Sequence, residues 1–178
     1  MRLVGRSDDE WNIVAAEKPT IGEAIFPFSV LGLVVSLVLT LVGILLRSGD
    51  KSILVELVSQ VVVDAGTVAA FAAVSGLVAR RFDAVRPAMA EVAAIYSCVG
   101  IWMTSALGFI PVPALGWLWY LMGVVYTGYL WMRALDVVVG VAGESRTRAM
   151  IASGAALVIV AGVLRGVRYA VLVGMGVY

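Results

Sequence analysis

The side chain most suggestive of chemistry is an acidic residue in an otherwise apolar stretch, Asp64. It follows Ile53 by eleven residues, so a helix would place it about 16 Å along its axis, near the middle of a bilayer. A charge at that depth costs about 2.5–3.5 kcal/mol on insertion scales, which makes Asp64 a candidate functional residue. Tyr126 and Thr127 are predicted at a similar depth. Two interpretations stay open: Asp64 handles a proton, cation or polar substrate, or it hydrogen-bonds across helices and fixes their packing.

A second group of charged residues is predicted near the inner membrane face. It consists of Glu91, Arg133 and Asp136, which come from two consecutive apolar stretches. Arg133 could bridge the two acids, and long charged side chains near helix ends commonly reach water. We therefore interpret this group as a structural ion cluster.

Residues that usually perform catalysis are scarce in this chain. Histidine is absent, Cys98 is the single cysteine, and no glycine-rich phosphate loop with a lysine occurs. These facts exclude histidine-based triads, histidine metal sites and an intrachain disulfide. The net charge of +1 provides no basic field for nucleic acid. We predict that the protein is not an enzyme and has no cofactor, no metal and no nucleic-acid partner.

Membrane helices must position these side chains, because the composition does not suit a water-soluble domain. Of 178 residues, 62% are hydrophobic and only 14% charged, whereas soluble domains are about 25% charged. Long uncharged stretches bounded by charges or prolines predict an all-α, polytopic transmembrane helix bundle in the plasma membrane. Its five predicted spans are 25–46, 53–79, 87–109, 115–139 and 149–165.

The polar residues 1–24 precede the five-helix domain 25–178 and are predicted to form a cytoplasmic or interfacial segment. Ser-Asp-Asp-Glu at 7–10 supplies an N-cap and an acidic first turn for a short helix. Trp11 in that helix is predicted to be an interfacial anchor at the level of the lipid headgroups.

Basic residues predict the orientation, with the N-terminus inside and the C-terminus outside. Nine of them fall on the inner side in that arrangement and four on the outer side, which agrees with the positive-inside rule. The inner residues are Arg2, Arg6, Lys18, Arg80, Arg81, Arg86, Arg133, Arg146 and Arg148, and the outer ones are Arg47, Lys51, Arg165 and Arg168.

Small residues favour close helix packing in the second span. Ala65, Ala69 and Ala73 recur at four-residue spacing and would build a smooth face for a neighbouring helix. Gly162 and Gly166 form one GxxxG motif in the last span, which permits a homo-oligomer.

Several segments resemble the prokaryotic branch of the Yip (Ypt-interacting-protein domain) family of membrane proteins. The similar segments are Trp-Asn-Ile-Val-Ala-Ala-Glu at 11–17, Ala-Ile-Tyr-Ser at 94–97, the turn 111–117 and Tyr-Thr-Gly-Tyr-Leu at 126–130. The resemblance implies five membrane helices, a cytosolic N-terminus and a C-terminus across the membrane. It also implies a role in membrane organisation or trafficking through protein partners, with no catalytic residues.

Two function classes follow. The first is a non-enzymatic, Yip-like adaptor or membrane-organising, trafficking-type factor, embedded in the lipid bilayer with a protein partner at its cytoplasmic face. The second is a small transporter or channel subunit with Asp64 on the permeation or proton path. Lipid handling is a further possibility, and it would require a polar groove open to lipid.

Overall fold

The computed structural model describes residues 7–46, 53–105 and 113–176 of the chain. Every regular element in these ranges is helical and none is a strand, which confirms the predicted all-α class. The elements are α1 Ser7–Glu17, α2 Ile21–Ala24, η1 Ile25–Ser29, α3 Val30–Leu46, α4 Ile53–Arg81, α5 Ala88–Ser97, α6 Val99–Ser105, α7 Pro113–Ala134, η3 Leu135–Val139 and α8 Gly143–Gly174.

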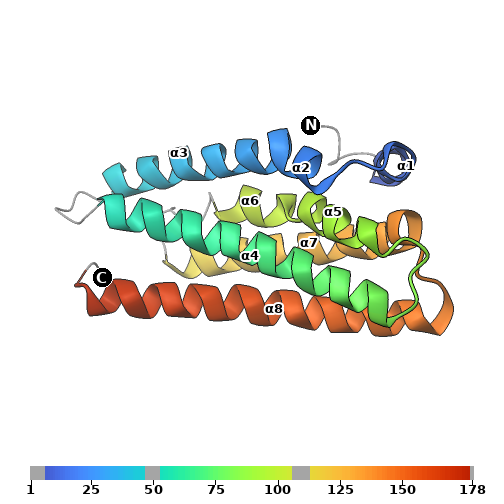
Figure 1. Cartoon of the computed structure of the whole chain (residues 1–178). Coiled ribbons are helices and arrows are strands. Elements are labelled where there is room, and N and C mark those ends of the chain that lie inside the picture. Colours follow the sequence, from blue (N-terminus) through green and yellow to red (C-terminus); the bar gives the residue numbers. More distant parts are fainter. Residues whose placement is uncertain (1–6, 47–52, 106–112, 177–178) are drawn as a thin grey trace.

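Five rods lie side by side in the bundle (Figure 1). They are α3, α4, the pair α5–α6, α7 and α8, and the short helices α1 and α2 lie at one end. Within the described ranges, two helices are long and apolar enough to cross a membrane by length and composition, namely the 29-residue α4 and the 32-residue α8. The segments Val30–Val42 and Ala88–Trp102 are apolar but shorter.

A kink separates α2 from α3, and the sequence explains it. Phe26 has extended backbone angles (φ −106°, ψ 122°) where the helix would otherwise continue. The residue before a proline is disfavoured in the helical region, and Pro27 follows Phe26. The long helix of the first predicted span therefore begins at Val30 rather than at residue 25.

The short helix α2 begins with a capping box that also sets the charge state of its acid. The Thr20 hydroxyl accepts a hydrogen bond from the Glu23 amide, and the Glu23 carboxylate accepts one from the Thr20 amide at 2.7 Å. These bonds, first the backbone one and then that of the Thr20 hydroxyl, lower the pKa of Glu23 from its ordinary value of 4.5. The chain thus enters the bundle in a fixed direction.

The third predicted span is divided at Cys98 into α5 and α6, and α6 packs very closely on α7. A Cβ at Gly100 would lie 2.6 Å from the Gly123 carbonyl oxygen and 2.8 Å from Thr127 Oγ1. Only glycine permits this approach, because a larger side chain would force the two helices apart.

The last helix is longer than the last predicted span, and the sequence left the conformation of residues 166–178 open. The predicted fifth span ends at residue 165, whereas α8 continues without a break to Gly174. Its continuation carries Arg165 and Arg168 along the bundle instead of into the water beyond it. The physical reason is that both arginines find partners on neighbouring helices, as described below.

The hydrophobic core lies around α5 and includes the N-terminal helix. Trp11 is fully buried in this core, where α1 packs against α7 and η3. The predicted interfacial anchor is therefore covered by protein rather than by lipid headgroups. Nearby, Phe71 meets Trp131 edge-on at 5.7 Å between ring centroids, and Trp131 Nε1 donates a 2.6 Å hydrogen bond to Ser153. These contacts tie α4, α7 and α8 together.

Candidate functional site

The helices bring polar and charged side chains together inside one half of the bundle. We call this group the polar cluster. On α4, Glu56, Gln60 and Asp64 are spaced by four residues, so they share one face of the helix. The complete cluster consists of Ser36 from α3, Glu56, Ser59, Gln60 and Asp64 from α4, Tyr120 from α7, and Arg165 and Arg168 from α8.

Asp64 is the centre of the cluster and is almost completely buried, with 1% of its surface exposed. Its Oδ2 atom accepts hydrogen bonds from the Ser36 hydroxyl at 3.1 Å and from Gln60 Nε2 at 2.6 Å. The first of these bonds joins α3 to α4, so the carboxyl group fixes the packing of two helices. This geometry corresponds to the interhelical role considered for Asp64.

Two arginines from α8 supply positive charge beside this acid. The charges of Arg165 and Arg168 both act on Asp64, that of Arg165 more strongly. The guanidinium carbon of Arg165 lies 3.5 Å from the centre of the Tyr120 ring, which is a cation–π contact. Arg168 Nε donates a hydrogen bond to Ser59 Oγ at 3.0 Å. The two guanidinium groups match the carboxyl groups of Asp64 and Glu56 in formal charge.

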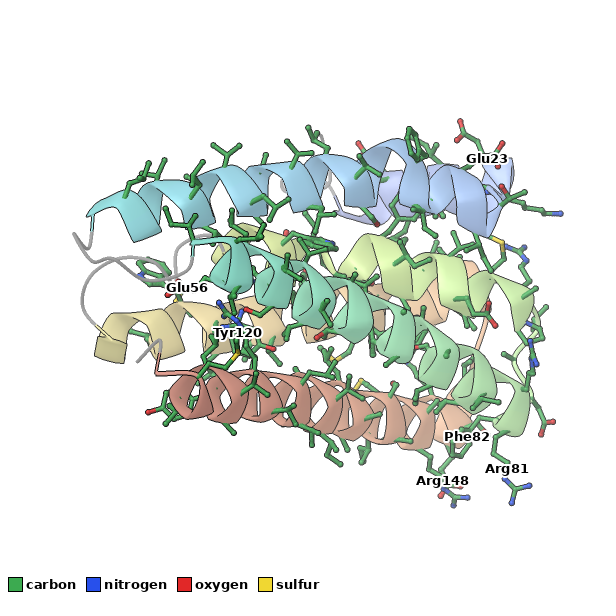
Figure 2. All side chains as sticks on the ribbon, turned by 60° about the vertical axis from the view of Figure 1, so that its left-hand side comes forward. Glu23, Glu56, Arg81, Phe82, Tyr120 and Arg148 are labelled. Atoms are coloured by element: carbon green, nitrogen blue, oxygen red, sulfur yellow. The ribbon has the colours of Figure 1, made fainter. Side chains whose placement is uncertain are left out.

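Part of the cluster retains unused hydrogen-bonding capacity. Glu56 is 4% exposed, and its Oε2 atom lies near the end of the bundle where α4 begins (Figure 2). Among the described residues, neither this atom nor Nε and Nη2 of Arg165 has a hydrogen-bond partner in the protein. Buried polar atoms without a partner cost roughly 1–3 kcal/mol each. The cluster therefore offers both an acceptor and cationic donors to a small polar species.

Tyr126 and Thr127, the other two polar residues predicted at mid-membrane depth, have neighbours different from those of Asp64. Thr127 is buried on α7 where that helix meets Gly100, and the Tyr126 ring stacks on Tyr129 at 6.4 Å. It is Tyr120, six residues before Tyr126, that α7 contributes to the polar cluster.

The two acids predicted to share Arg133 in one inner-face cluster each form an ion pair with another arginine. Glu91 Oε1 lies 3.5 Å from Arg80 Nη2, and Asp136 Oδ1 lies 2.5 Å from Arg146 Nε. The guanidinium carbon of Arg133 lies 5.7 Å from the centre of the Tyr129 ring. Each acid thus has an arginine partner that the sequence analysis did not assign to it.

Sequence reasoning missed most members of the polar cluster, although signals for them exist. The charge count assigns Arg165 and Arg168 to the outer side, yet they stand three residues apart and an apolar stretch follows them. Such spacing puts both on one face of a continuing helix. Glu56, Gln60 and Asp64 likewise form a polar row at four-residue spacing in an apolar helix.

Metal chemistry has no visible basis in the part of the chain that the structure describes. No three of its cysteine, aspartate and glutamate side chains gather closely enough to hold an ion. The thiol of Cys98 is buried.

The fold and the site define a class, an all-helical bundle that contains two candidate membrane-spanning helices and a buried polar cluster. Comparisons of this chain with protein-family models, with curated proteins and with solved structures find no match. The resemblance to the Yip family therefore stays a prediction from the sequence.

Proposed function

We propose that the protein is a five-span, multi-pass integral protein of the plasma membrane that works as a non-enzymatic, Yip-like adaptor or membrane-organising factor. Membrane embedding is supported by large apolar side chains that the bundle leaves uncovered. On α8, for example, Ile159 is 63% exposed and Val163 is 57% exposed. Similar side chains run along α3 and α7, and lipid removes the cost of leaving such a surface uncovered.

The arrangement of the rods supports the proposal of five spans. In Figure 1, α3, the pair α5–α6 and α7 lie beside α4 and α8, which are the two helices long enough to cross by themselves. If α4 and α8 cross the bilayer, their neighbours in the same bundle cross with them. Three shorter rods then complete the five.

The charge distribution supports an inside N-terminus more strongly than the sequence count did. Two of the four basic residues counted outside, Arg165 and Arg168, belong to the polar cluster. Subtracting two from four leaves Arg47 and Lys51, which lie outside the described residues, against nine on the inner side. The positive-inside rule then favours the same orientation by a wider margin.

The observation that carries the adaptor proposal is the charged end of the bundle. Glu23, Arg81 and Arg148 all lie at this end, opposite to Glu56 and Tyr120 (Figure 2). The buried indole of Trp11 holds α1 firmly against the same end. A rigid surface with exposed charges of both signs is suited to binding a protein, because complementary charges select and steer a partner.

Crosslinking in native membranes tests this proposal. We expect one recurrent partner to be captured by the unchanged protein and lost from an Arg81→Glu/Arg148→Glu variant. An Arg81→Lys/Arg148→Lys variant keeps both charges and should retain the partner. A protein that is captured alone, or a partner retained equally by both variants, would contradict the proposed docking end.

The unpartnered atoms of Glu56 and Arg165 favour a second candidate, a small transporter or channel subunit that moves a proton or small ion past Asp64. Flux assays in proteoliposomes decide between this role and a structural one. An Asp64→Asn variant should lose transport if the carboxyl group takes part. Full flux through that variant removes this second candidate and leaves the adaptor proposal untouched.

A further inference from the structure

A cavity of about 420 Å³ lies among η1, α3, α4, α5 and α6, apart from the polar cluster. Its walls are almost wholly apolar and include Leu33 of α3, Ile95 of α5 and Trp102 of α6. The volume falls within the range of ligand pockets, about 300–1,000 Å³, and well above the roughly 150 Å³ that accepts a benzene molecule.

Small residues of α4 create this space. Ala65, Ala69 and Ala73 were expected to pack closely on another helix, but all three are exposed and line the cavity. Eight residues separate the first from the last, so this wall is about 12 Å long. The kink at Phe26 changes the direction of the chain just before α3. The methyl side chains of α4 are too short to fill the space between α4 and this segment. An apolar space along these methyl groups results.

The polar groups of the cavity point to the kind of molecule that fits it. Ser29 is 9% exposed, and within the described ranges its hydroxyl oxygen has no hydrogen-bond partner. Glu91 also lines the cavity and lies against α4 at Gly76, three residues beyond Ala73, where an added Cβ would be 2.5 Å from Glu91 Oε1. Glu91 pairs with Arg80, whose side chain is 62% exposed. One end of the apolar space thus carries a negative and a positive group together.

We propose that this cavity binds one acyl chain of a zwitterionic bilayer phospholipid. The chain lies along Ala65, Ala69 and Ala73, the phosphate meets the Arg80 guanidinium, and the ammonium group meets the Glu91 carboxylate. The assignment rests on the membrane embedding proposed above. A second protein helix would not fit, since a helix about 10–12 Å in diameter occupies roughly 1,000 Å³ over 12 Å of length, more than the cavity holds. A single flexible chain matches both the volume and the paired charges at the end.

Native mass spectrometry tests the assignment on protein transferred from vesicles of equal parts phosphatidylethanolamine and phosphatidylglycerol. We expect one retained phosphatidylethanolamine per protein, and loss of that lipid when Ala69→Leu/Ala73→Leu fills the cavity. The matched control is Ala155→Leu/Ala170→Leu, which adds the same bulk at two exposed positions of α8 and should retain the lipid. Equal retention by the two double variants overturns the proposal, as does an unchanged protein that carries no lipid.

A surface variant keeps the test decisive if the filled cavity prevents folding. Glu91→Gln keeps the shape of a partly exposed side chain but removes the charge assigned to the ammonium group, so it should reduce the preference for phosphatidylethanolamine over phosphatidylglycerol by about two- to fivefold, the range of an exposed ion pair. An unchanged preference contradicts the headgroup assignment. Alkaline carbonate washing of membranes separates the two proposals. Release of the protein by carbonate refutes membrane embedding itself, whereas a retained protein without bound lipid refutes only the lipid assignment.

Discussion

Removing the Asp64 carboxylate would take away one of the two acidic groups that balance Arg165 and Arg168 in the polar cluster. In an Asp64→Ala variant, the hydrogen bonds from Ser36 and Gln60 are also lost. Hydrogen bonds to a charged group contribute about 1.5–3 kcal/mol each, and the nearby positive charges lose part of their compensation. These effects overlap, so we expect a loss of about 3–5 kcal/mol in the free energy of unfolding.

Thermal unfolding in detergent, followed by loss of the monodisperse peak in size-exclusion chromatography, measures this change. For a chain of this size, 1 kcal/mol shifts Tm by about 2–4 °C, so the expected decrease is roughly 6–20 °C. Asp83→Asn is the matched control, because Asp83 is exposed in the turn after α4 and asparagine tolerates its positive φ. That variant should leave Tm almost unchanged.

A double-mutant cycle separates charge pairing from simple loss of packing. Arg165→Met alone should lower Tm because Asp64 then loses its stronger positive neighbour. The combined Asp64→Ala/Arg165→Met variant should lose less stability than the sum of the single variants, with a coupling of about 0.5–3 kcal/mol. Additive effects, or an Asp64→Ala shift below about 2 °C, would refute the reasoning.

Three further predictions concern other parts of the bundle. Gly100→Ala should destabilise the protein by about 1–3 kcal/mol, because the added Cβ would collide with α7. The control is Gly154→Ala, whose added Cβ meets no described atom within 4 Å. In the same thermal assay it should be neutral or slightly stabilising. Trp11→Ala should lower the free energy of unfolding by about 3–5 kcal/mol and release α1 from the bundle. Limited proteolysis within residues 7–17 would detect the released helix. Continued protection of that helix would contradict the assignment of Trp11 as the side chain that anchors it. Because the pKa of Glu23 is lowered in the folded chain, its carboxylate stabilises α2 fully above the ordinary value of 4.5, and that contribution disappears as the pH falls through the lower folded value. The hydrogen-exchange protection factors of the α2 amides, which compare their rates with those of the unfolded chain at the same pH, should therefore fall in acid, and Glu23→Gln should abolish this pH dependence.

The helical segments were largely predictable because hydropathy and helix-ending residues act locally. The second predicted span, 53–79, corresponds to α4 Ile53–Arg81, and the Ser-Asp-Asp-Glu motif does begin an N-terminal helix, α1 Ser7–Glu17. The start of the first long helix was less predictable: the predicted span begins at residue 25, whereas the backbone is extended at Phe26, before Pro27, and the long helix begins at Val30.

Side-chain partners could not be obtained in the same way. The sequence left open whether residues 166–178 extend the last helix, because the partners of Arg165 and Arg168 could not be assigned; the structure continues α8 to Gly174. Whether an arginine leaves or stays depends on what faces it, and Tyr120 and Ser59 come from helices 45 and 109 residues away in the sequence. The same limit explains why Glu91 and Asp136 were given Arg133 as a shared partner rather than Arg80 and Arg146.

The sequence alone therefore determined that this chain is helical, where its principal helices lie, and that Asp64 stands in an otherwise apolar stretch. These properties follow from composition and from the spacing of residues along a single helix. The tertiary structure decided that Asp64 bonds to Ser36 and Gln60 with two arginines nearby, that Trp11 is covered by protein, and that the alanine row of α4 borders a cavity. Those outcomes depend on the rotation and separation of neighbouring helices, which no local pattern encodes.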